Sequence, residues 1–266
     1  MTAAMAKGAD VAGFNAINAR LKQEPDFDRA KVDAIKAGLA VPEGERPTQI
    51  RVRTRRMTRA ELDYLKMKVE ARTNLIVIGG TGSGKTTFLN LLSSWIPPGE
   101  RIVTGEDAAE LRLRHNHVVR LETRPPNLEG QRAITARDLV RNALRMRPDR
   151  IIVGEVRGDE VLDMLQAMNT GHDGSMTTLH ANNVRDAMHR IELLAGFAGY
   201  TGGEKTLRGQ IAAAIQLVVH VSRLSSGQRR VMSITELNGL QGEELVMRDV
   251  FRFEPDTGIV VPQEAA

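Results

Sequence analysis

The chain of 266 residues has no cysteine, few aromatic side chains and no apolar run long enough to span a membrane. Without cysteine there is no disulfide framework, which suits a reducing compartment. The absence of a signal peptide and of an 18-residue apolar run predicts a soluble, cytoplasmic protein with no membrane span. Aromatic residues make up 3%, with one Trp and two Tyr. A stacking platform for nucleic acid is therefore missing, and this argues against a nucleic-acid partner.

Length and charge limit the number of domains and the kinds of partner. Hydrophobic residues make up 41%, which is enough for one large domain, or for one medium domain with a small appendage. The net charge is +4 and the sequence pI is 9.6. Six arginines and no acid lie between Arg46 and Arg59, and the alternation from Ile50 to Arg53 predicts an edge strand with one charged face. That face is either solvated, or contacts a neighbour's nucleotide or an anionic partner.

The stretch from Asn74 to Thr87 gives the strongest chemical signal. The apolar run from Leu75 to Ile78 predicts a strand buried on both faces, and a helical pattern follows the glycines. Between them stands a full match to G-x-x-x-x-G-K-[ST], and the residues predicted to bind nucleotide are Gly79, Gly80, Thr81, Gly82, Ser83, Gly84, Lys85, Thr86 and Thr87. Glycines let successive N–H groups point inward at a helix start. Lys85 then reaches the β- and γ-phosphates, and the Thr86 hydroxyl binds Mg²⁺.

Two other predicted strands end in acids. One runs from Arg101 to Thr104 and continues into Glu106 and Asp107, and the other leads into Glu155. Because α/β folds place ligand chemistry at the carboxyl ends of their strands, these acids are candidates for the site, although capping of a helix explains Asp107 equally well. The strand before Glu155 has the shape of a Walker B strand, with glycine where an aspartate commonly stands. Glu155 must therefore supply that strand's contribution, including a ligand to Mg²⁺.

Histidines occur at two places of interest. A predicted strand from Ser175 ends at His180, which is either part of the site or a structural residue that caps the next helix. Residues 111–122 predict a hairpin, with His115 and His117 at its turn and with arginines facing outward, namely Arg112, Arg114 and Arg120. Nothing nearby completes a metal site around these two histidines.

Periodicity elsewhere predicts an α/β chain in three parts. Residues 1–48 form a helical extension and linker, residues 49–72 a basic strand and a helix with a capping box, and residues 73–266 the nucleotide-binding domain. Beyond His180 we expect two helices and then three strands, at 184–195, 204–215, 217–223, 229–236 and 246–253.

The combination of motifs resembles the ATPases of type II and type IV secretion systems, in particular the branch that powers tight-adherence pilus assembly (CpaF/TadA-like). The resemblance spans residues 50–255 and rests on stretches that match in order and spacing, including Glu106-Asp-Ala-Ala-Glu-Leu111, Arg120-Leu-Glu-Thr-Arg-Pro-Pro126, Gly154-Glu-Val-Arg157 and Thr177-Thr-Leu-His-Ala181. It implies a RecA-like P-loop core with a mostly parallel sheet. It also implies a homohexameric ring that hydrolyses ATP with Mg²⁺, in the cytoplasm and peripheral at the inner membrane, beside a membrane platform protein.

The resemblance also implies roles for individual residues. Glu106 and Asp107 correspond to the Asp box, Glu155 to the Walker B acid and His180 to a residue near the γ-phosphate. Which of Glu106 and Glu155 is the general base stays open. An arginine finger is expected ahead of the phosphate loop, where Arg53 fits best and Arg51 is the alternative.

Two other functions stay open at the sequence level. The short region ahead of the phosphate loop favours a nucleotide-gated assembly module that scarcely hydrolyses ATP. The arginine clusters favour a nucleic-acid motor, against which the shortage of aromatic side chains counts.

Overall fold

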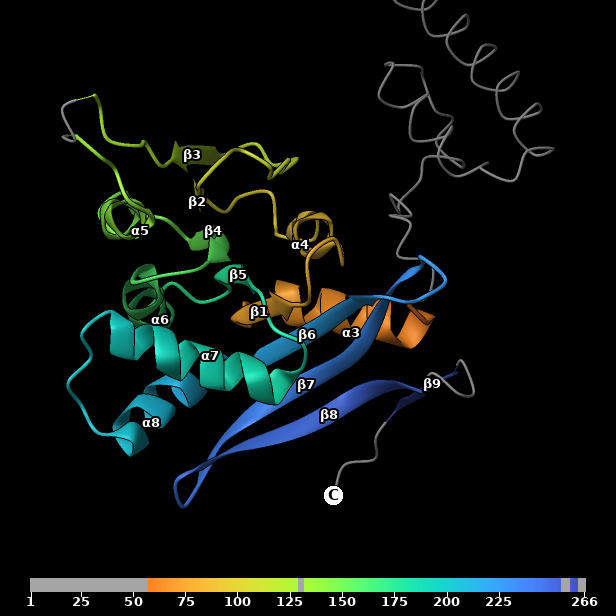
Figure 1. Ribbon diagram of the computed structural model, residues 1–266. Coiled ribbons are helices and arrows are strands. Elements are labelled where there is room, and N and C mark those ends of the chain that lie inside the picture. The colour runs from red at the N-terminus through yellow and green to blue at the C-terminus, as the bar shows by residue number, and fades with distance from the viewer. Residues whose placement is uncertain (1–56, 129–131, 255–258, 263–266) are drawn as a thin grey trace, which may run out of the picture. The chain divides into compact units, whose positions relative to one another are not determined.

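Nine strands form one mixed sheet in the part of the chain that a computed structural model describes, residues 57–128, 132–254 and 259–262. The strand order is β3-β2-β4-β5-β1-β6-β7-β8-β9 (Figure 1). The first six strands in this order run parallel, and β7, β8 and β9 continue the sheet antiparallel. The predicted class, α/β with a mostly parallel sheet, is confirmed. The predicted N-terminal helices and the strand with Arg51 and Arg53 lie outside the described residues.

The parallel strands have four to seven residues, whereas β7 and β8 of the antiparallel half have 13 and 11. Their bounds are β1 Leu75–Ile78, β2 Ile102–Glu106, β3 Val118–Glu122, β4 Arg150–Val156, β5 Met176–Leu179, β6 Leu217–Arg223, β7 Arg229–Gln241, β8 Glu244–Glu254 and β9 Ile259–Pro262. The central strands β1 and β5 are buried along their whole length, since helices cover both faces of the sheet there.

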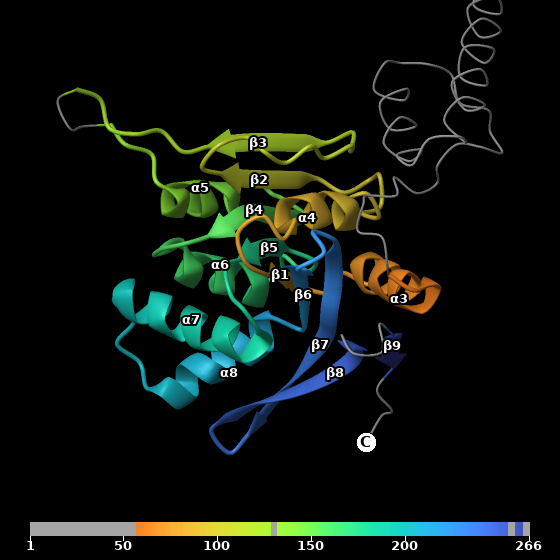
Figure 2. The same cartoon turned by 45° about the vertical axis from the view of Figure 1, so that its right-hand side comes forward.

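Helices pack on the two faces of the sheet and make two cores (Figure 2). Their bounds are α3 Arg59–Glu70, α4 Lys85–Ser93, α5 Ala136–Ala143, α6 Glu160–Asn169, α7 Val184–Phe197 and α8 Glu204–Ala214. Ile76 and Ile78 of β1 face the core that α5 to α8 cover, whereas Leu75 and Val77 face the core under α3 and α4. Among the described helices, none combines the length and the apolar character that a membrane crossing requires.

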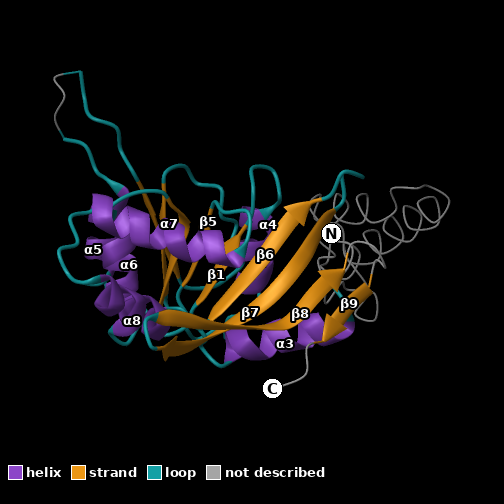
Figure 3. Ribbon diagram, turned by 60° about the horizontal axis from the view of Figure 1, so that its bottom comes forward, coloured by secondary structure: helices purple, strands orange, loops and turns teal. Residues whose placement is uncertain are grey.

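The capping box that the sequence predicts within residues 49–72 lies at the start of helix α3. The Thr58 hydroxyl accepts a bond from the Glu61 N–H, and the Glu61 carboxylate accepts one from the Thr58 N–H, which completes the capping box. Farther along, Tyr64 and Lys68 donate to the same Glu236 oxygen on β7, at 2.6 and 2.8 Å. Together these contacts fix the helix against the sheet, below the antiparallel strands in Figure 3.

The predicted hairpin at residues 111–122 is wrong. Only Val118–Glu122 forms a strand, and it pairs with β2 in parallel, Ile102 opposite Val118. Two parallel neighbours need a crossover connection, and residues 107–117 supply it without a helix. The alternation of Leu111 and Leu113 reflects burial of this crossover in the α4 core.

At the amino edge of the parallel strands, a buried arginine joins several segments. The Arg150 side chain is 0% exposed, and two of its nitrogens donate to Glu100, at 2.6 and 3.0 Å. It also donates to the Val69 carbonyl at the end of α3, at 2.9 Å, and to the Gly174 carbonyl before β5, at 3.4 Å. A buried charge is tolerated only when it is paired and hydrogen-bonded, and this one meets both conditions.

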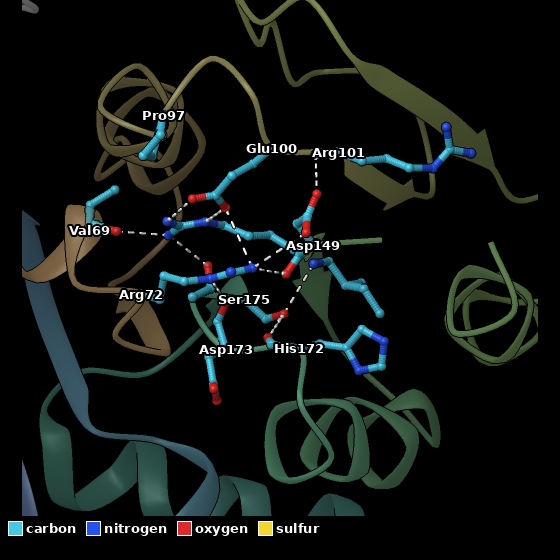
Figure 4. Close-up of polar contacts among 12 residues, drawn as sticks. Val69, Arg72, Pro97, Glu100, Arg101, Asp149, His172, Asp173 and Ser175 are labelled. Atoms are coloured by element: carbon cyan, nitrogen blue, oxygen red, sulfur yellow. Dashed lines mark hydrogen bonds and ion pairs between the residues drawn. The ribbon is translucent and has the colours of Figure 1, made fainter. Parts of the chain in front are cut away.

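Arg72 and Asp149 extend this polar network toward the surface (Figure 4). Arg72 donates to the backbone carbonyls of Asp149 and Asp173, at 2.9 and 3.4 Å. The Asp149 carboxylate in turn accepts from the Arg101 N–H at 2.6 Å. Asp173 and Gly174, which precede β5, thus lie at the amino edge of the parallel strands.

Candidate active site

The carboxyl ends of four neighbouring strands bring the predicted site residues to one edge of the sheet. The order β2-β4-β5-β1 places Glu106, Glu155, His180 and the glycine loop side by side at the ends of these strands. Ile78 is opposite Leu179 in the β1–β5 ladder, so His180 and Gly79 leave the sheet at the same level. The fold therefore brings motifs that are far apart in the sequence to the same edge of the sheet.

The phosphate loop connects β1 to α4, with Gly84 as the N-cap of the helix and Lys85 as its first residue. The Lys85 ammonium donates to the carbonyls of Gly79 and Gly80, at 3.0 and 3.3 Å. Burial lowers the pKa of Lys85, the attraction of Glu155 opposes this shift, and Arg157 adds to it. The ammonium thus lies across the loop. The oxygens of a bound phosphate would replace these two carbonyls as its hydrogen-bond acceptors.

The Thr86 hydroxyl donates to the carboxylate of Glu110 at 3.3 Å. Glu110 was not among the predicted site residues, although it belongs to the stretch that begins at Glu106. Its spacing of four residues from Glu106 could have identified it as a candidate site residue. Glu110 therefore brings a further carboxylate to the predicted Mg²⁺ ligand.

Glu106 is buried at the end of β2, with 5% of its surface exposed. One carboxylate oxygen accepts the backbone N–H groups of Glu110 and Leu111, at 3.1 and 2.8 Å. Burial raises the pKa of Glu106, the two N–H groups lower it in part, and the nearby Glu110 and Glu122 raise it further. A carboxyl group held this way is suited to proton transfer.

Position 154 has little room for a side chain, because Glu106 lies against it. A Cβ added to Gly154 would stand 3.1 Å from the Glu106 Cγ. The β4–β5 register also shifts between Val153 and Val156, and the Thr178 hydroxyl donates to the Gly154 carbonyl at 2.7 Å. Such an irregularity redirects a strand's side chains next to a site. A side chain at position 154 would therefore have to shift Glu106 by a few tenths of an ångström.

Glu155 is half-buried and pairs with an arginine two residues on. Arg157 donates to the same oxygen of Glu155 through Nε at 2.9 Å and through Nη2 at 2.5 Å. It also donates to the Asp107 carboxylate at 3.3 Å. Asp107 is followed by the crossover rather than by a helix, so the capping explanation of Asp107 is wrong. Arg157 belongs to one of the stretches that carry the family resemblance, but no role was predicted for it.

His180 is half-buried directly after β5, and it does not cap the next helix, whose N-cap is Asn183. A second histidine, His220 of β6, is opposite Ile78 in the β1–β6 ladder. Burial lowers the pKa of His220. His220 was not among the predicted site residues, because the sequence predicts its strand but not that this strand is next to β1. Arg53 lies outside the described residues.

The residues at this edge fit a nucleoside triphosphate with Mg²⁺. The Ser83 hydroxyl in the loop is buried and has no hydrogen-bond partner among the described residues. A Cβ added to Gly80 or Gly82 would meet nothing within 4 Å, which leaves space for an anion beside these two glycines. Within the same residues no cluster of three His, Asp or Glu side chains could hold a metal alone. Mg²⁺ needs none, because it takes one or two protein ligands and completes its shell with phosphates and water.

Comparisons with known proteins agree with this geometry. The family described as "Type II/IV secretion system protein" matches residues 45–253. The chain belongs to this family. Within the family, a putative conjugal transfer protein of Mycobacterium tuberculosis is 50% identical over 174 residues, which are 65% of this chain and 49% of that protein. The type IV secretion system protein PtlH of Bordetella pertussis is 42% identical over 189 residues, 67% of this chain and 54% of PtlH.

Among solved structures, the VirB11 ATPase of the Brucella suis type IV secretion system, in complex with sulphate, aligns with a TM-score of 0.61. The sequences are 27% identical, and the alignment covers 81% of this chain and 59% of VirB11. The chain thus spans about half the length of the curated relatives that it matches. Membership of the tight-adherence branch stays a prediction.

Proposed function

We propose that this chain is an ATP-hydrolysing motor subunit of a secretion or pilus-assembly system. The observation that carries the proposal is the meeting of the phosphate loop with the carboxylates of Glu106 and Glu155 at one edge of the sheet. Family membership and the VirB11 neighbour support the same activity.

Hydrolysis requires in-line attack of water on the γ-phosphate, with charge spread over the equatorial oxygens. Lys85 and the loop amides hold the phosphates, and Thr86 with Glu155 or Glu110 would hold Mg²⁺. Mg²⁺, when bound, neutralises charge on the phosphate oxygens. Glu106, whose pKa is raised by burial, is our candidate for the group that takes the proton from water, and Glu155 is the alternative. His180 would contact the γ-phosphate from β5.

The ion pair between Arg157 and Glu155 favours a second candidate function. In this arrangement the Arg157 guanidinium donates twice to one oxygen of the Glu155 carboxylate. A nucleotide-gated assembly module, which binds ATP but hardly turns it over until a partner breaks that pair, is consistent with this contact. Turnover by the isolated chain above a Lys85→Ala background would exclude the module.

A ring is the expected assembly, with six copies beside a platform protein at the inner membrane. We further propose that Arg53 supplies the arginine finger, with Arg51 as the alternative, and that assembly brings it to the site. Turnover per subunit should then rise with protein concentration in step with mass measured by light scattering. Arg53→Ala should remove the rise and leave nucleotide affinity unchanged. Constant specific activity while the oligomer dissociates would contradict this assignment.

A direct test is steady-state phosphate release with MgATP, measured with and without EDTA. We expect turnover that needs the divalent ion and that disappears in Lys85→Ala. Equal phosphate release by wild type and by Lys85→Ala would refute the ATPase assignment.

A further inference from the structure

Arg229 reaches the phosphate loop from the antiparallel half of the sheet. It is the first residue of β7, and its Nε donates to the Gly82 carbonyl at 3.0 Å. Its side chain also crosses Gly84, where a Cβ would stand 2.9 Å from the Arg229 Cδ. Gly84 has φ +96°, a conformation that glycine adopts without strain. One arginine therefore contacts two glycines of the loop.

The strand next to β7 supports the same loop at its start. β6 pairs with β1 in parallel, and a Cβ on Gly79 would stand 2.2 Å from the Val221 carbonyl oxygen. The backbone of β6 thus lies against the first glycine, while Arg229 lies against the later ones. The turn that joins these two strands, residues 224–228, is closed by bonds from Leu224 N–H to Gln228 O and from Gly227 N–H to Leu224 O, both 2.8 Å.

Strand pairing does not account for an arginine at position 229. In the β6–β7 ladder Arg229 is directly opposite Arg223, and like charges in that position are destabilising. The adjacent Arg230 is buried, with its guanidinium 3.7 Å from the centre of the Phe253 ring. The two consecutive arginines therefore serve different contacts, one in the core of the sheet and one at the phosphate loop.

We propose that Arg229 is a positioning residue for nucleotide binding, which holds the phosphate loop through the Gly82 carbonyl and couples the loop to the 224–228 turn. The proposal rests on the proposed nucleotide site. A glycine-rich loop loses much conformational freedom when it binds a ligand. A charged hydrogen bond that fixes the loop beforehand reduces that cost and raises affinity. Since Arg229 contacts the loop and not the reacting atoms, its loss should raise KM more than it lowers kcat.

The test measures the Kd of MgADP by calorimetry on the full chain. Arg229→Met keeps the apolar part of the side chain over Gly84 and removes the donor, whereas Arg229→Ala removes both. The matched control is Arg223→Ala, which removes the same charge from the opposite position of the ladder. We expect Kd to rise about tenfold in Arg229→Ala and by a smaller factor in Arg229→Met, with Arg223→Ala within about twofold of wild type.

Hydrogen exchange gives a second readout, measured on the wild-type chain and on Arg229→Met. MgADP should slow exchange in residues 224–228 as well as in the loop, and in Arg229→Met it should slow exchange in the loop alone. Unchanged exchange in the 224–228 turn of the wild type on binding would overturn the coupling. Affinity within about twofold of wild type in both Arg229 variants, or an equal loss in Arg223→Ala, would overturn the positioning role. Failure of the wild type to bind MgADP would instead refute the nucleotide site itself.

Discussion

The two edges of the parallel sheet hold their charged residues in opposite ways. At the amino edge Arg150 is fully buried, and it is bonded to a carboxylate and to two backbone carbonyls. At the carboxyl edge Lys85 and Glu155 are half-buried, and they bond to groups that a nucleotide or an ion can replace. The first arrangement fixes the starts of the strands, and the second leaves their ends available for chemistry. Substitutions at the amino edge should therefore change stability, and substitutions at the carboxyl edge should change nucleotide binding and turnover.

The largest expected effect is at the carboxyl edge. Lys85→Ala should abolish ATP hydrolysis and weaken nucleotide binding, because the loop then lacks its fixed positive charge for the β- and γ-phosphates. The melting temperature should change little, since Lys85 donates to backbone carbonyls of its own loop. Lys66→Ala on the exposed face of α3 is the control and should retain full turnover. Hydrolysis by Lys85→Ala at the rate of this control would contradict the assignment.

At the amino edge the expected effect is on stability. Arg150→Ala leaves the Glu100 carboxylate without its bidentate partner, and breaking a buried pair costs about 3–5 kcal/mol. Denaturant unfolding followed by circular dichroism measures this loss. Because an apolar replacement of the whole pair is often neutral, Arg150→Met combined with Glu100→Leu should recover most of it. If Arg150→Ala has the same unfolding midpoint in denaturant as the wild type, the pair of Arg150 and Glu100 does not stabilise the amino edge of the sheet.

Glu106→Gln and Glu155→Gln should each lower turnover on the order of 100-fold, with nucleotide binding kept in at least one of them. Both substitutions keep the size of the side chain, so the packing of Glu106 against Gly154 should survive. The pH profile of kcat distinguishes the two acids. If Glu106 is the base, the acidic limb should lie above the usual range of a glutamate, since burial raises its pKa. A variant with wild-type turnover would show that its acid is structural.

The smallest expected effect is a pH dependence of stability at Glu236. Burial raises the pKa of Glu236, but the hydrogen bonds from Lys68, Tyr64 and Arg248 outweigh burial and lower it to about 2. A carboxylate with a lowered pKa stabilises the fold above its usual pKa of 4.5, and this contribution is lost as pH falls from there toward 2. Wild type should lose more unfolding free energy across that range than Glu236→Gln. Parallel curves for the two proteins would contradict the prediction.

Local signals in the sequence predicted much of the fold. The capping box at Thr58, the apolar run of β1 and the glycine pattern before Lys85 each depend on neighbouring residues, and each appears where it was expected. The alternation around Leu111 and Leu113 led to the wrong prediction of a hairpin, because burial of an irregular crossover produces the same period as a strand.

The candidate site was predictable in its acids and its loop but not in its supporting residues. Glu106 and Glu155 follow apolar runs, and strand ends in α/β folds are expected at one edge. Arg157, Arg229 and Glu110 act through contacts that depend on which strands are neighbours, and on where a crossover returns. Strand order cannot be obtained from the periodicity of a single chain, so these three residues became visible only in the folded arrangement.

The close approach of Glu106 to Gly154 has a consequence for redesign. An engineer who restored the aspartate of a standard Walker B strand at position 154 would place its Cβ 3.1 Å from the Glu106 Cγ. To admit it, the Glu106 side chain would have to shift by a few tenths of an ångström, which would disturb the bonds that its carboxylate accepts from the Glu110 and Leu111 N–H groups. Two carboxyl groups so close would also repel each other, so a second acid at position 154 would change the protonation of Glu106 rather than add an independent ligand.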